Sequence, residues 1–430
     1  MKDLIIKGNK GRIFGEVRVP GDKSISHRSI ILGAMAEGDT LVKNGLISED
    51  IIRTIQAFRS MGVSIEVEED GILIHGVGLG GLKKPAEPID CGNSGTTARL
   101  LSGILAGQTF SSTLIGDESL SKRPMDRVII PLSKMGANIR GRENKYLPLE
   151  IRPAKGKLKA LSYELPVASA QVKSAILLAT LFAQGITEVI EKKTTRDHTE
   201  RMLEYFGCHI RKKDKSIIMD SEAFLEGKNI YVPGDISSAA YFIVAATLIK
   251  GSNLVVRDVG INPTRNGIIH VLKSMGADIT TFNERVINNE PVGDISVKYA
   301  PLKGVTMDRE ITAIIIDEIP ILAVAACLAQ GRTVIRDVQE LKYKESNRIE
   351  AISKELRKMG AKIEAVEDGL IIEGVDRLQG AEVDSHGDHR IAMALSIGGL
   401  AAYGDTQIDN HQCVNVSYPS FYDTLASLYI

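Results

Sequence analysis

The sequence predicts a mixed α/β (α+β) protein of two domains, built from repeated β-α-β-α-β-β units. Three observations predict this fold: a chain of 430 residues, a strand–turn–helix pattern that recurs six times, and a tetrapeptide that returns about half a chain later. A chain of this length is too long for one ordinary hydrophobic core, so at least two domains are expected. Self-similarity at a regular spacing is typical of repeated architectures.

Each predicted unit begins with a strand that enters a short polar or glycine-containing turn and continues into an apolar helix. The six turns lie at 20–24, 91–95, 167–171, 233–237, 316–318 and 386–390. We expect these apolar helices to end at glycine, as in 29–38, 175–185 and 240–251, because glycine accepts the left-handed conformation that closes a helix.

A second helix is expected in five of the units, again ending at glycine. These glycines are Gly62, Gly136, Gly207, Gly276 and Gly360. A pair of alternating strands follows each one, which completes the β-α-β-α-β-β pattern. The sixth unit stops without its second half. Two N-terminal segments, 4–8 and 15–19, resemble the strands expected at 370–384, so we expect them to complete the sixth unit.

The tetrapeptide Val-Pro-Gly-Asp occurs at 19–22 and again at 232–235. It predicts two domains of three units each. Residues 21–230 would form an inserted domain, and residues 1–20 with 231–430 would form a discontinuous one. The chain would cross twice between them, as in a hinge. We expect the active site in the cleft between the domains.

Composition argues against several classes of protein. Lys and Arg number 53 against 54 Asp and Glu, and this balance does not favour a nucleic-acid surface. The longest apolar run, 239–249, is too short to cross a membrane. The first residues lack a signal-peptide core, and the four cysteines are scattered without a C-x-x-C pair. We expect a cytoplasmic monomer without nucleic-acid or membrane partners, metal or cofactor.

The turns have the chemistry of anion sites. A helix N-terminus carries unpaired backbone N–H groups and about half a positive charge, and so favours anions. Glycine lets the backbone approach a phosphate closely. Six such turns in register therefore predict binding of small anions.

Lysines and arginines gather in and beside these turns. They lie in the segments 22–28, 122–126, 195–198, 344–348 and 388–390. Any one of them could be an ordinary solvated surface charge. Because they recur at matching places in successive units, we interpret them as ligands of anions. The basic run 211–215 lacks this context, and we expect it to be the exposed face of a hairpin.

At these motifs the sequence resembles the 5-enolpyruvylshikimate-3-phosphate synthase family, the enolpyruvyl transferases of aromatic amino-acid biosynthesis. Two stretches carry the resemblance: Cys-Gly-Asn-Ser-Gly-Thr-Thr-Ala-Arg-Leu-Leu at 91–101, and the segment 342–356 that contains Lys-Glu-Ser-Asn-Arg. The segments 20–28, 121–126 and 388–390 reinforce it. The resemblance extends from Val19 to Tyr418.

The resemblance implies two inside-out α/β barrels of three units each, which close on phosphoenolpyruvate and shikimate 3-phosphate. The enolpyruvyl group would move to the 5-hydroxyl of shikimate 3-phosphate by addition and elimination through a tetrahedral intermediate, with release of phosphate. Glyphosate, an inhibitor known for the family, would bind near Gly95 and Arg123. No metal or organic cofactor is implied.

The resemblance also assigns residues to three roles. The catalytic residues would be Asp317, Glu345 and Lys23. Shikimate 3-phosphate would contact Lys23, Ser24, Arg28, Ser169, Ala170, Gln171, Thr195, Arg196, Asp317 and Lys344. Phosphoenolpyruvate would contact Lys23, Asn93, Gly95, Arg123, Gln171, Arg348, His389 and Arg390.

Several positions keep a second interpretation. Asp317 could instead be the N-cap of its helix, and His389 could either bond a phosphate or order its turn. Cys91 is expected to be structural. Ala170 stands where some relatives have serine, and Val416 stands where some have a phosphate-binding lysine.

Two rival functions remain. UDP-N-acetylglucosamine enolpyruvyl transferase shares the fold and chemistry, but that family usually carries a reactive cysteine five residues before the arginine, where this chain has Glu118. A non-catalytic anion-binding module would have the same cleft. No P-loop or H-E-x-x-H motif supports an ATPase or a metalloenzyme.

Overall fold

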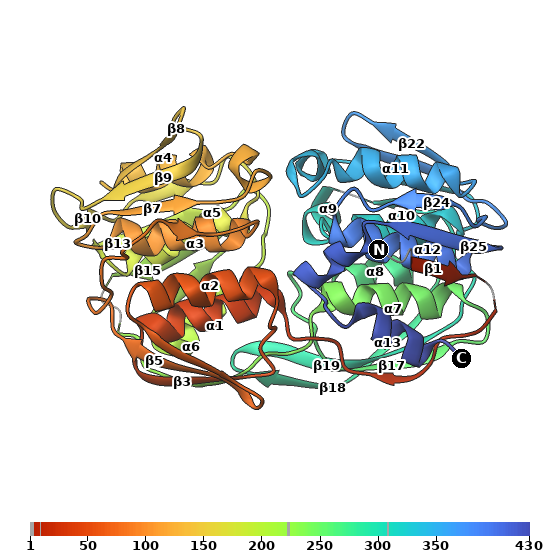
Figure 1. The fold of residues 1–430 in the computed structure, drawn as a ribbon, viewed down its shortest axis with the longest axis horizontal. Coiled ribbons are helices and arrows are strands. Elements are labelled where there is room, and N and C mark those ends of the chain that lie inside the picture. Colours follow the sequence, from red (N-terminus) through yellow and green to blue (C-terminus); the bar gives the residue numbers. More distant parts are fainter. Residues whose placement is uncertain (1–3, 9, 222–223, 308) are drawn as a thin grey trace. The chain divides into compact units, whose positions relative to one another are not determined.

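The structure is a computed structural model that describes residues 4–8, 10–221, 224–307 and 309–430. The chain has a mixed α/β fold in two compact units, each with its own hydrophobic core (Figure 1). Unit 1 comprises Met1–Pro20, Pro233–Val286 and Pro291–Ile430. Unit 2 comprises Gly21–Val232 together with Ile287–Glu290. None of the helices that the described residues form has the length and apolarity needed to cross a membrane.

Unit 2 has three four-stranded sheets within the described residues, all with one strand order. The first contains β16 (Asn229–Tyr231), β3 (Glu37–Lys43), β5 (Gly71–Val77) and β4 (Ser64–Glu68). The second contains β6 (Ile89–Asp90), β7 (Ser112–Ile115), β9 (Tyr146–Arg152) and β8 (Asn138–Arg142). The third contains β11 (Ser162–Glu164), β13 (Ile186–Ile190), β15 (Ser216–Asp220) and β14 (Ile210–Lys213). A small parallel pair joins β10 (Leu158–Lys159) and β12 (Ala183–Gln184).

Unit 1 repeats the same strand order in two sheets and shortens it in a third. One sheet contains β2 (Phe14–Val17), β17 (Asn253–Gly260), β19 (Glu290–Lys298) and β18 (Asp278–Ile287). Another contains β20 (Thr306–Met307), β21 (Arg332–Ile335), β23 (Gly369–Glu373) and β22 (Lys362–Val366). The three-stranded sheet contains β24 (Glu382–Asp384), β25 (Asp405–Asp409) and β1 (Leu4–Lys7). In all six sheets the first strand named is parallel to the second, and the third is antiparallel to the second.

The two N-terminal strands have different partners. β1 is antiparallel to β25, with Leu4 opposite Ile408, which confirms that an N-terminal strand completes the last sheet. β2 instead lies parallel to β17, with Phe14 opposite Asn253, so its predicted place in the last sheet is wrong. The physical reason is that β24 and β1 already occupy the two edges of β25.

The helices are of two kinds. Helices α1 (Lys23–Met35), α3 (Gly95–Ala106) and α5 (Ala170–Thr180) in unit 2, and α7 (Ile236–Leu248), α10 (Ile319–Cys327) and α12 (His389–Ala401) in unit 1, are buried over most of their length. Helices α2 (Glu49–Ser60), α4 (Asp126–Lys134), α6 (His198–Phe206), α8 (Gly267–Ser274) and α11 (Arg348–Lys358) each bury one face. The short helices α9 (Arg309–Ile314) and α13 (Phe421–Leu428) and the 3₁₀ turns η1 (Leu120–Lys122), η2 (Gln339–Tyr343) and η3 (His411–Val416) complete the chain.

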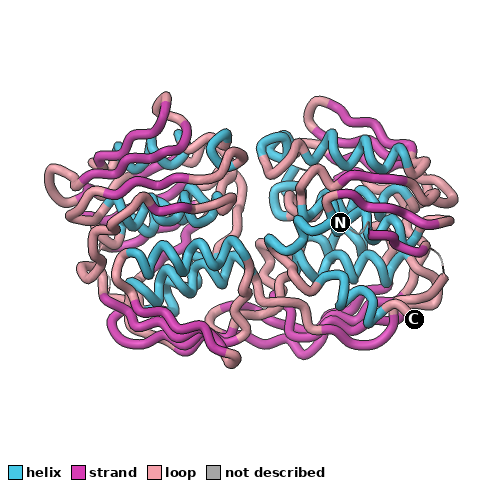
Figure 2. The backbone as a smooth tube through the Cα atoms, viewed as in Figure 1, coloured by secondary structure: helices cyan, strands magenta, loops and turns pink. Residues whose placement is uncertain are grey.

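Sequence pattern explains this division. α10 buries all nine of its residues and contains only apolar ones, as a helix with no solvent face must. The amphipathic helices end where predicted, since all five glycines at 62, 136, 207, 276 and 360 have positive φ. In each unit the strands flank the helices (Figure 2).

The predicted ends of the buried helices are wrong. α1 ends at Met35, and Gly38 lies inside β3 with φ of 86°. α5 and α7 likewise end before Gly185 and Gly251, which have φ of 100° and 81°. These glycines shape the start of the following strand and not the helix terminus.

Gly103 lets α3 pack closely on α5. A Cβ atom at Gly103 would lie 2.3 Å from the backbone oxygen of Ala175. A backbone atom inside a helix cannot move aside as the end of a flexible side chain could. We expect Gly103→Ala to lower the free energy of unfolding by about 1–3 kcal/mol, as overpacking does. Urea unfolding would measure the loss.

Gly80→Ala is the matched control, because a Cβ there would have no heavy atom within 4 Å. Equal stability of the two variants would contradict the close-packing argument.

Candidate active site

In unit 1 the predicted site residues gather around Arg348, the first residue of α11. Its side chain is 1% exposed. Its Nε donates to Asp388 Oδ2 at 2.8 Å, its Nη2 to Glu345 Oε2 at 2.5 Å, and its Nη1 to Asp317 Oδ1 at 3.4 Å. One guanidinium therefore joins the N-terminal ends of α10, α11 and α12.

Lys344 and Arg390 also contact Asp317. Lys344 Nζ lies 3.3 Å from Asp317 Oδ1, and Arg390 Nη1 donates to the backbone oxygen of Asp317 at 3.1 Å. Arg390 also lies near Glu318, with Nη1 3.8 Å from Oε1. His389, the first residue of α12, is 2% exposed. All six residues assigned to this unit therefore belong to one cluster.

Charge pairing keeps Asp388, Arg348 and Arg390 ionised despite their burial. Burial by itself raises the pKa of Asp388, but Arg348 outweighs it, and the pKa of Asp388 lies below its ordinary value. For Arg348 and Arg390 burial acts to lower the pKa, yet Asp388 and Asp317 respectively hold each pKa above its ordinary value. These three groups are thus fixed charges within the cluster.

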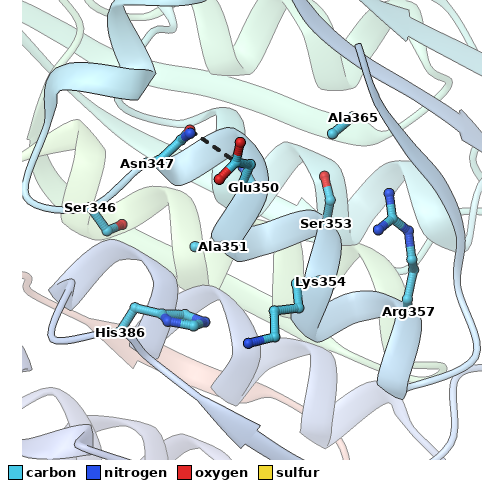
Figure 3. Close-up of a pocket in the computed structure, with 9 residues that line it drawn as sticks. All are labelled: Ser346, Asn347, Glu350, Ala351, Ser353, Lys354, Arg357, Ala365 and His386. Atoms are coloured by element: carbon cyan, nitrogen blue, oxygen red, sulfur yellow. Dashed lines mark hydrogen bonds between the residues drawn. The ribbon is translucent and has the colours of Figure 1, made fainter. Parts of the chain in front are cut away.

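A pocket of about 440 Å³ lies beside this cluster, along α11 (Figure 3). Ser346 and Asn347, which lie between Glu345 and Arg348 in the sequence, are among the residues that line it. Asn347 caps α11, because its Oδ1 accepts from the backbone nitrogen of Glu350 at 3.5 Å. The segment that carries Lys344 and Glu345 is therefore anchored to α11 from this side.

In unit 2 the first two turns of α1 carry Lys23, Ser24 and Arg28. Lys23 Nζ lies 3.0 Å from Asp50 Oδ2. Arg28 donates from Nη1 to the backbone oxygen of Ser24 at 2.9 Å and from Nε to Thr199 Oγ1 at 2.6 Å. Arg28 is buried, and burial lowers its pKa to about 10.

The start of α3 brings Asn93, Gly95 and Arg123 together. Arg123 Nη2 donates to Asn93 Oδ1 at 2.5 Å and to Ser119 Oγ at 3.2 Å. A Cβ atom at Gly95 would lie 2.7 Å from Arg99 Nη1 and 3.6 Å from Arg123 Nη1. Because Gly95 has no side chain, both guanidinium groups can lie close to the N-terminus of α3. This concentration of positive charge suits an anion.

The start of α5 is joined to the start of α3. Ser169 is the N-cap and accepts from the backbone nitrogen of Val172 at 3.4 Å, and Ala170 is the first helical residue. Gln171 Nε2 donates to Thr96 Oγ1 at 2.8 Å. All eleven residues assigned to this unit lie at the starts of α1, α3 and α5 or in the loops at 123 and 195–196.

The structure decides several of the alternatives. Glu318, and not Asp317, is the N-cap of α10, so the capping interpretation of Asp317 is wrong. Arg28, Arg123, Arg348 and Arg390 are buried, so they are not solvated surface charges. The run 211–215 does form an exposed hairpin, between β14 and β15.

The four cysteines all lie in the described part of the chain and none is disulfide-bonded there. Burial raises the pKa of Cys91, Cys208 and Cys327 to about 12 and that of Cys413 to about 11. A thiol with a raised pKa is a poor nucleophile at neutral pH. This environment supports a structural role for Cys91 and disfavours a reactive-cysteine enzyme.

Sequence reasoning missed the carboxylates that hold the cations. Asp388 had a usable signal, because it matches Asp22 and Asp235 at the helix-starting turns, and all three cap their helices. Asp50, the partner of Lys23, had none, because it lies in the first turn of another helix. Its contact depends on tertiary structure.

The fold and these basic helix starts place the chain among α/β proteins that bind small anions. A family model described as EPSP synthase (3-phosphoshikimate 1-carboxyvinyltransferase) matches residues 8–425. The 3-phosphoshikimate 1-carboxyvinyltransferase of Desulforamulus reducens is 52% identical over 430 residues, covering 100% of both chains. That of Brevibacillus brevis is 50% identical over 418 residues, covering 97% of this chain and 98% of its own.

A solved EPSP synthase from Acinetobacter baumannii has a TM-score of 0.89 and 46% identity, covering 100% of this chain and 98% of that one. The chain therefore belongs to the EPSP synthase family. It is an enzyme of that family, an enolpyruvyl transferase of the shikimate pathway.

We expect Arg348→Met to lower the free energy of unfolding by about 3–5 kcal/mol near neutral pH, because it leaves Asp388 buried without its ion pair. The folded-state pKa of Asp388 is depressed, so the pair stabilises the fold above about pH 4 and the contribution is lost as the pH falls through the folded-state pKa. The deficit of the variant should therefore shrink on acidification. Urea unfolding at neutral and acidic pH would measure it.

Arg332→Met is the matched control, because Arg332 forms an exposed pair with Glu373 at 3.3 Å. We expect it to cost at most about 1 kcal/mol. A similar cost at both positions would show that the Arg348 pair is not a buried charge cluster.

Proposed function

We propose that this chain transfers the enolpyruvyl group of phosphoenolpyruvate to the 5-hydroxyl of shikimate 3-phosphate and releases inorganic phosphate, on the route to chorismate. The observation that carries the proposal is the buried cluster in which Arg348 joins Asp317, Glu345 and Asp388. It places three carboxylates and several cations within one site, which suits proton transfer on a polyanionic substrate.

Substrate charge explains the number of cations. Each phosphate carries about −1.5 to −2 at neutral pH, and each substrate also has a carboxylate. Arginine can hold a phosphate or carboxylate with two parallel hydrogen bonds, whereas lysine acts as a point charge.

We assign the unit 2 groups Lys23, Ser24, Arg28, Ser169, Ala170, Gln171, Thr195 and Arg196 to shikimate 3-phosphate, together with Asp317 and Lys344 of unit 1. Phosphoenolpyruvate is assigned to Lys23, Asn93, Gly95, Arg123, Gln171, Arg348, His389 and Arg390.

The reaction needs a proton to enter and then to leave. In the addition step the 5-hydroxyl oxygen bonds to C2 of phosphoenolpyruvate, loses its proton, and C3 gains a proton. In the elimination step the tetrahedral intermediate loses phosphate from C2 and a proton from C3. We assign the hydroxyl proton to Asp317, and the C3 and phosphate protons to Glu345 and Lys23, each well-placed group contributing about 10²–10⁴ in rate.

The wider architecture is part of the proposal. Each domain would be an inside-out α/β barrel of three β-α-β-α-β-β units, with domain boundaries at 20/21 and 230/231 and the active site in the cleft between the domains. The protein would act as a cytoplasmic monomer on small molecules only. The shared strand order of the sheets supports the repeated units.

The proposed function is tested by measuring inorganic phosphate released from phosphoenolpyruvate and shikimate 3-phosphate, with each substrate omitted in turn. Release that requires both substrates is expected. UDP-N-acetylglucosamine serves as the alternative acceptor. Release with that acceptor alone would transfer the assignment to the rival enzyme, and binding of both substrates without release would indicate an anion-binding module.

We expect Asp317→Asn to lower kcat by at least about 100-fold, because it removes a proton acceptor while keeping the shape of the side chain. Binding of shikimate 3-phosphate, measured by calorimetry, should remain detectable. Asp423→Asn, on the exposed face of α13, is the control. Unchanged turnover in Asp317→Asn would remove this carboxylate from the mechanism.

A further inference from the structure

Unit 2 contains a fully buried lysine that the proposed mechanism does not use. Lys173 lies in α5, two residues after Gln171, and its side chain is 0% exposed. Its Nζ lies 3.0 Å from Glu191 Oε1 and 2.7 Å from Glu200 Oε1. Burial alone would lower the pKa of Lys173, but the two glutamates hold it above its ordinary value, so the ammonium stays charged.

Glu191 connects this lysine to the segment that carries Thr195 and Arg196. Its Oε1 accepts from the backbone nitrogen of Thr195 at 3.1 Å and also from the Thr195 hydroxyl. Lys173 Nζ donates to the backbone oxygen of Thr195 at 3.5 Å. Thr195 is thus held by its backbone nitrogen, its backbone oxygen and its hydroxyl, all through one buried ion pair.

The far end of the same segment is also anchored. Asp197 accepts from Arg201 Nε at 2.8 Å and from Lys212 Nζ at 3.0 Å. Arg196 therefore lies between two fixed residues in the connection from β13 to α6. Such anchoring limits the positions that its guanidinium can reach.

A hydrogen-bond chain continues from α5 to α1. Ser174, the neighbour of Lys173, bonds Thr199 Oγ1 at 2.6 Å, and both hydroxyls accept from Arg28, at 2.8 Å and 2.6 Å. Arg28 is therefore oriented by the helix that carries Lys173 and by the helix that follows Thr195 and Arg196. Three residues assigned to shikimate 3-phosphate share one buried support.

A stability role alone does not account for this arrangement. Burying an ion pair is often no better for stability than burying apolar residues of the same volume, because desolvation offsets the attraction. The charged groups instead fix the position of the segment that they bind. Such precision matters because the ligands of a phosphate must be placed to within a fraction of an ångström.

We propose that Lys173 and Glu191 are positioning residues that hold Thr195 and so place the adjacent Arg196 for the 3-phosphate of shikimate 3-phosphate, which determines the affinity for that substrate. This inference rests on the proposed function, in which Thr195 and Arg196 are assigned to shikimate 3-phosphate. Neither Lys173 nor Glu191 touches the substrate, and both act through Thr195.

The first test is Glu191→Gln, which keeps one acceptor but removes the charge that binds Lys173. The KM for shikimate 3-phosphate should rise about tenfold, the effect expected for one hydrogen bond to a charged group. The kcat should stay within about twofold, since the reacting groups are untouched. The KM for phosphoenolpyruvate should change least.

Glu188→Gln is the matched control. Glu188 lies on the same strand, β13, and its side chain accepts a solvent-exposed hydrogen bond from Ser162 Oγ at 2.9 Å. All kinetic parameters of this variant should equal those of the unchanged enzyme. An unchanged KM for shikimate 3-phosphate in Glu191→Gln, or a loss confined to kcat, would overturn the inference.

A triple variant separates positioning from folding. Lys173→Met alone would leave two carboxylates buried without a cation, and the chain could fail to fold for that reason. Lys173→Met combined with Glu191→Gln and Glu200→Gln is neutral, so thermal unfolding should be close to that of the unchanged protein while the KM for shikimate 3-phosphate stays raised. A stable triple variant with normal KM would overturn the inference.

Arg196→Ala distinguishes this inference from the proposed function. If Arg196→Ala weakens shikimate 3-phosphate binding and Glu191→Gln does not, the binding assignment stands and the positioning role fails. If Arg196→Ala leaves binding unchanged, the assignment of the phosphate to this segment fails as well.

Discussion

The arrangement of unit 1 depends on the buried guanidinium of Arg348. It joins the N-termini of three helices, because its partners Asp317, Glu345 and Asp388 lie just before α10, α11 and α12. Without this cation Asp388 would lie buried beside Glu345 without its ion pair, and both burial and Glu345 would raise its pKa. The charges that make the site chemically useful are therefore the charges that hold it together.

Unit 2 reaches a similar result with a more distributed network. Gln171 and Thr96 join α5 to α3, Arg28 joins α1 to α5, and Lys173 holds the connection into α6. Each contact links a helix start to a neighbouring element, and the helices themselves are buried over most of their length. The polar groups that can meet a ligand are thus concentrated at the ends of helices whose sides are fully used in packing.

Local chemistry explains what the sequence could predict. Gly62 and its four equivalents mark helix ends because they require positive φ, and the pairing of β1 with β25 follows from a repeated strand pattern. The partner of β2 could not be predicted, since it depends on which sheet edge is unoccupied. The cations of the site were recognisable from motifs. Their carboxylate partners, such as Asp50, lie far away in sequence and meet them only in the folded chain.

The exchange of first strands has a consequence for dissecting the molecule. β2 precedes α1 in the chain but pairs with β17, and β16 precedes α7 but pairs with β3. A fragment that began at Pro233 would lack β1 and β2 and would expose the edges of β25 and β17, which invites aggregation. The end of the chain already meets its beginning, because Arg12 and Ile430 exchange backbone hydrogen bonds of 2.8 and 3.0 Å. A circular permutant that joins Ile430 to Met1 and opens at Pro233 would make the main part of unit 1 continuous.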